Sequence, residues 1–179
     1  GSITIVKTVV GQVPPAEWVY TGDLGEFRLP AAGGTSEPFT GLVADDYTIT
    51  ETAKPGYVPS VTCDSGETGV GSVTVNLQPG ENVTCTFTNT AQPGSITIVK
   101  TVVGQVPPAE WAYTGDLGAF TLPAAGGSQR FDNLAAGVYI VEEDVVFGYE
   151  AAVVCDSGET GQGGVNIDLQ PGEAVTCTF

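Results

Sequence analysis

Residues 1–10, GSITIVKTVV, occur a second time without change as residues 94–103. Alternate positions of this stretch place Ile3, Ile5, Lys7 and Val9 on one face, and such period-two alternation is typical of a half-buried β-strand. Because an identical stretch returns 93 residues later, the chain is predicted to contain two copies of one domain.

The repetition extends along the whole chain. Residues 12–18 return as residues 105–111, and Tyr57 corresponds to Tyr149 after the second copy has lost one loop residue. We therefore expect domains at residues 1–90 and 95–179, joined by a short linker at 91–94 whose proline limits hinge motion. The last strand of the second copy is expected to be cut short at Phe179, which favours pairing of its edge with a further repeat or a neighbouring subunit.

Further alternating segments lie at residues 47–51, 73–77 and 83–89, and the turn QPGE at 78–81 separates the last two. Short apolar segments around Phe27 and Phe39 predict two more strands, and no helical periodicity competes with this pattern. About seven short strands per copy predict an all-β chain of two tandem immunoglobulin-like β-sandwich domains.

Composition excludes several classes of function. The formal net charge of -16 repels the phosphate backbone, so a nucleic-acid partner is not expected. The chain has no histidine, and the neighbouring carboxylates of Glu142 and Glu143 fall on opposite faces of one strand, so we do not expect an enzyme or a cofactor. No apolar run is long enough to span a membrane.

Four cysteines allow three disulfide pairings. Each copy holds one pair with the same spacing of 22 residues, which favours Cys63 with Cys85 and Cys155 with Cys177. A reduced pair in the core is the alternative, and a zinc site is less favoured because no histidine or CxxC motif accompanies the cysteines. Disulfides indicate an oxidising compartment, so we expect an extracellular or cell-surface protein.

Three polar residues fall on otherwise apolar strand faces. Lys7, Glu51 and Asn89 each alternate with core residues, and polar groups are costly to bury unless they satisfy one another. The competing interpretation places Lys7 and Asn89 near strand ends, where their side chains reach water.

Six stretches, in this order and spacing, resemble the prealbumin-like, Cna B-type (SpaA-like) repeat domains of bacterial surface proteins and pili. They are ITIVK at 3–7, GEFRL at 25–29, FTGL at 39–42, YTITE at 47–51, PGY at 55–57 and TCTFTN at 84–89. The resemblance implies a prealbumin-like β-sandwich and a spontaneous isopeptide bond between Lys7 and Asn89, promoted by Glu51.

The same resemblance implies an incomplete second set made of Lys100 and Glu143. The corresponding asparagine would lie two residues beyond Phe179, and alternation places Asn166 near the opposite face of its strand. We therefore expect no second bond within this chain by itself.

Two further features admit both a binding and a packing interpretation. Trp18 with Tyr20, and Trp111 with Tyr113, are candidate platforms for a sugar ring, or else they cover the edge of the sandwich or a domain junction. The acidic turns at 64–67 and 156–159 offer oxygen ligands for Ca²⁺, but their spacing matches no dedicated loop, and a plain turn is favoured, so no metal site is predicted.

The sequence thus favours a structural repeat segment of an extracellular stalk, adhesin or filament, whose partners are further copies of itself or neighbouring repeats. The alternative is a carbohydrate- or matrix-binding module that uses the Trp18 and Trp111 loops toward a host matrix or glycan.

Overall fold

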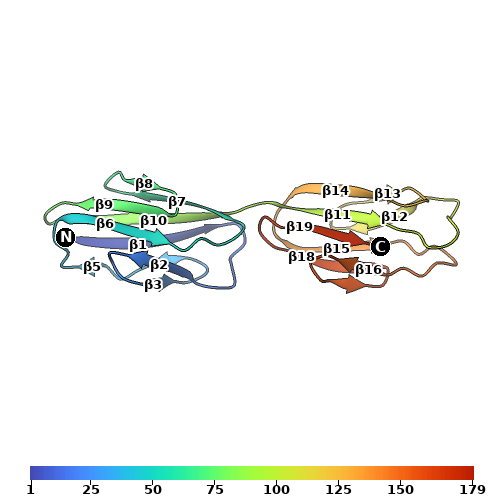
Figure 1. Cartoon of the computed structure of the whole chain (residues 1–179), viewed down its shortest axis with the longest axis horizontal. Coiled ribbons are helices and arrows are strands. Elements are labelled where there is room, and N and C mark those ends of the chain that lie inside the picture. The colour runs from blue at the N-terminus through green and yellow to red at the C-terminus, as the bar shows by residue number, and fades with distance from the viewer. The chain divides into compact units, whose positions relative to one another are not determined.

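The computed structural model describes all residues from Gly1 to Phe179, which form nineteen β-strands and no helix (Figure 1). The chain divides into two compact units, Gly1–Ala91 and Gln92–Phe179. At the joint, one strand continues through Ala91 and the next begins at Gly94, so Gln92 and Pro93 alone lie between them. The structure offers no helix with the length and apolarity that a membrane crossing requires.

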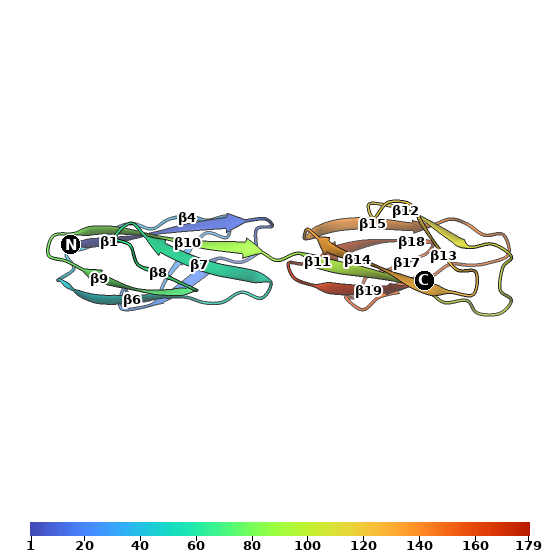
Figure 2. The ribbon, with the colours of Figure 1, turned by 90° about the horizontal axis from the view of Figure 1, so that it is seen from above.

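The first unit is a sandwich of two sheets (Figure 2). One sheet has the order β4-β1-β10-β7-β8, with β5 also paired to β1, and the other has the order β3-β2-β6-β9. The strands are β1 Ser2–Val10, β2 Trp18–Gly22, β3 Phe27–Leu29, β4 Gly34–Thr35, β5 Phe39–Thr40, β6 Asp45–Glu51, β7 Tyr57–Cys63, β8 Thr68–Gly69, β9 Ser72–Leu77 and β10 Asn82–Ala91.

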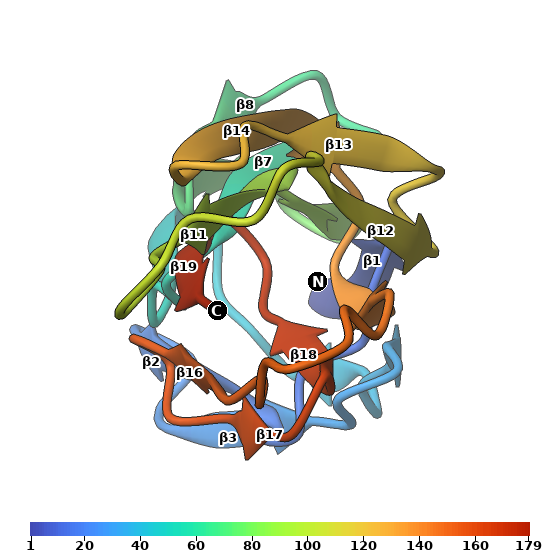
Figure 3. The ribbon, with the colours of Figure 1, turned by 90° about the vertical axis from the view of Figure 1, so that its right-hand side faces the viewer.

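The second unit repeats this arrangement with sheets β14-β11-β19-β16-β17 and β13-β12-β15-β18. Viewed end-on, β11 and β19 lie on one side of the unit and β12 and β18 on the other (Figure 3). The strands are β11 Gly94–Lys100, β12 Trp111–Gly115, β13 Phe120–Leu122, β14 Gly127–Leu134, β15 Gly137–Glu143, β16 Val153–Cys155, β17 Thr160–Gly161, β18 Gly164–Leu169 and β19 Ala174–Thr178.

The predicted all-β fold of two tandem sandwiches with about seven strands each is therefore confirmed. Seven strands of the first unit have three or more residues, and the remaining three are two-residue pairings at the sheet edges. Ile3, Ile5 and Phe87 are completely buried, as the period-two alternation predicts, and they pack between the two sheets.

The first and last strands of the first unit are direct neighbours. β1 and β10 pair in parallel along their whole length, with Lys7 beside Phe87 and Val9 beside Asn89. On its other side β1 pairs with β4, and Gly33, the residue just before β4, has a φ of 94°. A Cβ atom at this glycine would lie 2.6 Å from the backbone oxygen of Lys7, so only glycine fits this approach.

Each unit contains one disulfide. Cys63 on β7 is bonded to Cys85 on β10, and Cys155 on β16 is bonded to Cys177 on β19. In both units the two cysteines lie directly opposite each other in an antiparallel pair. Each disulfide therefore joins the last strand of its unit to a neighbouring strand, β10 to β7 and β19 to β16. The other neighbour of this last strand is β1 or β11.

We expect the double substitution Cys63→Ala with Cys85→Ala to lower the free energy of unfolding of the first unit by about 3 kcal/mol, because the closed loop spans 22 residues. Amide hydrogen exchange resolved along the chain should show the loss of protection in the first unit. The matched control is the double substitution Cys155→Ala with Cys177→Ala. In that variant the loss of amide protection should appear in the second unit instead. Unchanged protection in both variants would contradict the stabilising role.

Candidate functional site

Three polar side chains meet in the core of the first unit. Lys7 on β1 and Asn89 on β10 come from neighbouring strands of one sheet, and Glu51 ends β6 in the facing sheet. Their exposed fractions are 3%, 1% and 4%, respectively. The interpretation in which Lys7 and Asn89 reach water at strand ends is therefore wrong, because β1 continues past Lys7 to Val10, β10 continues past Asn89 to Ala91, and both side chains are buried.

The amine of Lys7 lies between the other two groups. Its Nζ donates a hydrogen bond of 2.8 Å to Oε2 of Glu51 and a second, short hydrogen bond to Oδ1 of Asn89. The Nδ2 group of Asn89 is buried and has no hydrogen-bond partner. An unsatisfied buried donor costs on the order of 1–3 kcal/mol. A reaction that removes the Nδ2 group of Asn89 would also remove this cost.

The environment of Lys7 favours the neutral amine. Burial lowers the pKa of Lys7 below its ordinary value of 10.5, the positive charge of Lys54 lowers it further, and the contact with Glu51 acts in the opposite direction. The face of the Trp18 ring covers the amine, with its centroid 3.8 Å from Nζ. A lysine in such a setting has more unprotonated, nucleophilic amine near neutral pH than an exposed lysine.

Tyr20 completes the cluster from β2. Its hydroxyl donates a 2.9 Å hydrogen bond to the same Oε2 atom of Glu51 that accepts from Lys7. Burial raises the pKa of Tyr20 far above its ordinary value of 10.0, and the Glu51 carboxylate raises it further, so the hydroxyl stays protonated. The cluster therefore contains an amine, a carboxylate, a carboxamide and a fixed hydroxyl donor.

Family models match both halves of the chain. Residues 3–91 match one SpaA prealbumin-like fold domain and residues 91–179 match another. The chain belongs to the SpaA prealbumin-like fold domain family. No curated protein matches it.

Solved structures of low sequence identity are also similar to this pair of prealbumin-like domains. The TIE protein of Bacillus anthracis is 17% identical at a TM-score of 0.49, and the match covers 100% of this chain and 34% of that protein. The major pilin T-13 of Streptococcus pyogenes is 15% identical at a TM-score of 0.40, covering 99% of this chain and 96% of the pilin. A minor pilin of Streptococcus agalactiae is 14% identical at a TM-score of 0.33, with coverages of 99% and 95%. The family assignment rests on the two family models.

The second prealbumin-like domain holds the incomplete set. Lys100 Nζ donates to both carboxylate oxygens of Glu143, each at 2.8 Å, and Tyr113 donates to Oε2 at 2.7 Å. The Trp111 ring covers Lys100 with its centroid 3.8 Å from Nζ. Asn166 is exposed on β18 and takes no part in the cluster. The lysine of this domain therefore has a carboxylate partner and no carboxamide beside it.

The prediction of a sugar-binding platform is wrong. Trp18, Tyr20, Trp111 and Tyr113 have exposed fractions of 2% or less, because they alternate on the inward faces of β2 and β12. The indole nitrogen of Trp18 donates to the backbone oxygen of Ala31 at 3.0 Å inside the domain. Inside each domain the tryptophan ring covers the lysine amine, and the tyrosine donates to the glutamate.

Sequence reasoning missed the role of Tyr20 in the lysine cluster. The available signal was the alternation of Trp18 and Tyr20 on one strand face, which indicates a buried aromatic pair. That Tyr20 lies beside Glu51 depends on the pairing of β2 with β6, in which these two residues are direct partners.

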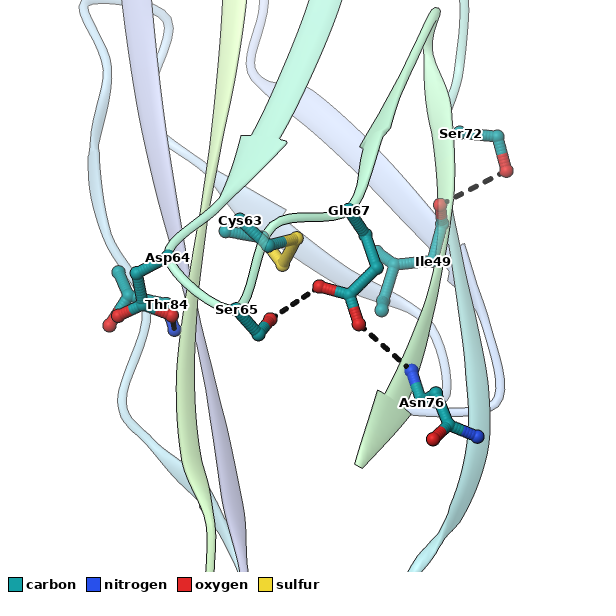
Figure 4. The surroundings of a disulfide bond; sticks show 9 residues. Ile49, Cys63, Asp64, Ser65, Glu67, Ser72, Asn76 and Thr84 are labelled. Carbon is teal, nitrogen blue, oxygen red and sulfur yellow. Dashed lines mark hydrogen bonds between the residues drawn. A yellow bond between two sulfur atoms is a disulfide. The ribbon is translucent and has the colours of Figure 1, made fainter. Parts of the chain in front are cut away.

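The acidic turn at 64–67 has its carboxylates engaged by donors of the domain itself (Figure 4). Glu67 accepts from the Ser65 hydroxyl and from the backbone nitrogen of Asn76 at 3.2 Å, and Asp64 accepts from the backbone nitrogen of Thr84 at 2.8 Å. The hydrogen bond from Ser65 lowers the pKa of Glu67. The turn thus ties the disulfide region to β9 and β10, and Glu159 makes the matching contacts in the second domain.

Proposed function

We propose that this chain is a structural segment of an extracellular surface protein, and that an isopeptide bond between Lys7 and Asn89 locks its first domain. The observation that carries the proposal is the position of Lys7 Nζ, which contacts both Glu51 Oε2 and Asn89 Oδ1 in a buried cluster. Glu51 promotes the reaction, and no other reactant is needed.

The reaction balances within the cluster. The unprotonated Nζ of Lys7 attacks Cγ of Asn89, the bond from Cγ to Nδ2 breaks, and Nδ2 leaves as ammonia. Glu51 takes a proton from the Lys7 amine and returns it to the leaving nitrogen, as a general base and then a general acid. Holding the amine against the carboxamide replaces a bimolecular encounter by an intramolecular step, which supplies most of the acceleration.

The position of the bond supports a mechanical role. Lys7 lies on the first strand of the domain and Asn89 on the last, and these strands pair in parallel. A force that pulls on the two ends of the domain acts along β1 and β10 in opposite directions and shears them apart. A covalent bond between these two strands carries that force directly, so the rest of the sandwich stays folded under load.

The compartment and partners follow from other features. One disulfide in each domain supports a position outside the cell, where such bonds persist. The net charge of -16 keeps the chain soluble in a crowded surface layer. Two domains of closely similar sequence in tandem support neighbouring repeats as the partners of this segment.

We expect the native protein to be lighter than its disulfide-corrected sequence mass by one ammonia. Intact-mass spectrometry measures this difference. A digest should then yield a branched peptide that joins the segments containing Lys7 and Asn89. A native mass equal to the disulfide-corrected sequence mass would overturn the proposed bond.

A further inference from the structure

Tyr20 holds the promoting carboxylate at a single atom. Oε2 of Glu51 receives the Tyr20 hydroxyl at 2.9 Å and the Lys7 amine at 2.8 Å. All three side chains are buried, so no water competes for that oxygen. A hydrogen bond to a carboxylate is charge-assisted and strongly directional, and a second donor on the same oxygen restricts rotation of the carboxylate.

The tyrosine is itself fixed on three sides. Its ring stacks on Phe27 with centroids 4.8 Å apart and meets Phe87 edge-on at 5.2 Å. Its backbone pairs with that of Glu51 across β2 and β6. The hydroxyl is therefore placed by the sandwich, and its position does not depend on the lysine or the asparagine.

The second domain supports this independence. Tyr113 makes the same hydrogen bond to Glu143 at 2.7 Å, and Tyr113 stacks on Phe120 at 4.8 Å, although no asparagine lies beside Lys100. In the first domain, by contrast, Lys7 donates to Oε2 of Glu51 and to the asparagine. The tyrosine–glutamate pair is thus a part of the fold that exists before any reaction.

We propose that Tyr20 is a positioning residue for isopeptide formation, which holds Glu51 Oε2 against the Lys7 amine while the amine attacks Asn89. This inference rests on the proposed function. Proton transfer requires the carboxylate within hydrogen-bond reach in the right orientation, and a displacement of about 1 Å can cost roughly a hundredfold in rate. Tyr20 acts through Glu51 and does not itself touch the carboxamide.

Tyr20 also affects the charge that Lys7 meets. The charged and titratable groups around the amine are Glu51 from β6, Lys54 from the loop after β6, and Tyr20 from β2, beside the Trp18 ring. The hydrogen bond from the Tyr20 hydroxyl partly offsets the negative charge on Oε2 of Glu51. Without it, Glu51 stabilises the ammonium form of Lys7 more strongly, which raises the pKa of Lys7 toward 10.5. Less neutral amine is then present at any given pH, so the rate profile moves to higher pH.

The test follows ammonia loss after folding. The full chain is prepared unreacted in denaturant, folding is started by dilution under conditions that form the disulfides, and intact mass is recorded with time at several pH values. We expect Tyr20→Phe, which keeps the ring and its packing, to slow ammonia loss by about 10- to 100-fold and to move the pH profile upward. Tyr113→Phe is the matched control and should leave the rate unchanged.

A further measurement separates positioning from a merely structural role. Replacing Tyr20 by 4-aminophenylalanine restores a donor at the same place and should recover most of the rate; it also serves if Tyr20→Phe does not fold. Ammonia loss from Tyr20→Phe at the parent rate, with the parent pH profile, would overturn the positioning role and leave the bond itself standing. A parent chain that never loses ammonia would overturn both proposals.

Discussion

Glu51→Ala should keep its full disulfide-corrected mass, and the missing bond should lower its free energy of unfolding by about 4 kcal/mol, in addition to the cost of losing the buried carboxylate. Without the carboxylate, no group takes the proton from Lys7 or returns one to the leaving nitrogen, so the bond does not form. The bond closes a loop between residues 82 apart, and such a crosslink stabilises mainly by restricting the unfolded chain. The disulfide between Cys63 and Cys85 already shortens that loop, which keeps the expected gain near this value. Mass spectrometry and denaturant unfolding measure the two effects.

Glu143→Ala is the matched control for Glu51→Ala. It also removes the carboxylate partner of a buried lysine, Lys100, but in a domain with no asparagine at the cluster. Its mass should equal that of the parent after allowing for the substitution, and any destabilisation reports the loss of the carboxylate that pairs with Lys100 and accepts from Tyr113. The difference between the two variants is the contribution of the bond. If Glu51→Ala still lacks one ammonia, Glu51 does not promote the reaction.

A chain extended after Phe179 by Thr-Asn-Thr, the residues that follow Phe87, should lose a second ammonia. Phe179 occupies the place of Phe87, since its ring meets Tyr113 edge-on at 5.2 Å just as Phe87 meets Tyr20. Its backbone already pairs with β11, because its nitrogen donates to Val99 and its oxygen accepts from Thr101, each at 2.8 Å. An asparagine two residues further continues this parallel register and brings its carboxamide to Lys100. Intact mass and the unfolding of the second domain are the measurements.

The extension Thr-Ala-Thr controls for the added strand. It provides the same backbone pairing without a carboxamide, so it should lose no second ammonia. The chain with the asparagine should exceed it in stability of the second domain by about 4 kcal/mol, for the same reason as in the first domain. An asparagine extension that keeps its nitrogen would show that Lys100, Glu143, Tyr113 and Trp111 are not sufficient for the reaction.

Alternation was enough to predict which side chains face the core. Ile3, Ile5 and Lys7 fall on the buried face of β1, and Asn166 falls on the exposed face of β18, as the period of two requires. The duplication predicted two sandwiches, and the equal spacing of the cysteines predicted a disulfide in each that the structure contains. These features follow from the local periodicity of the sequence and from the comparison of its two copies, which need no knowledge of the tertiary structure.

The sequence also determined that Lys7, Glu51 and Asn89 point inward, but alternation assigns a side chain only to a face. Which inward residues meet depends on strand order and on register between strands that lie far apart in the chain, and these are set by packing of the two sheets. Packing of the two sheets sets the parallel pairing of β1 with β10 and the pairing of Tyr20 with Glu51. The burial of Trp18 depends on the same packing. An aromatic residue on a short strand between loops can lie at the surface or in the core, and the position of the facing sheet determines which. Only the tertiary structure therefore brought amine, carboxylate, carboxamide and hydroxyl together.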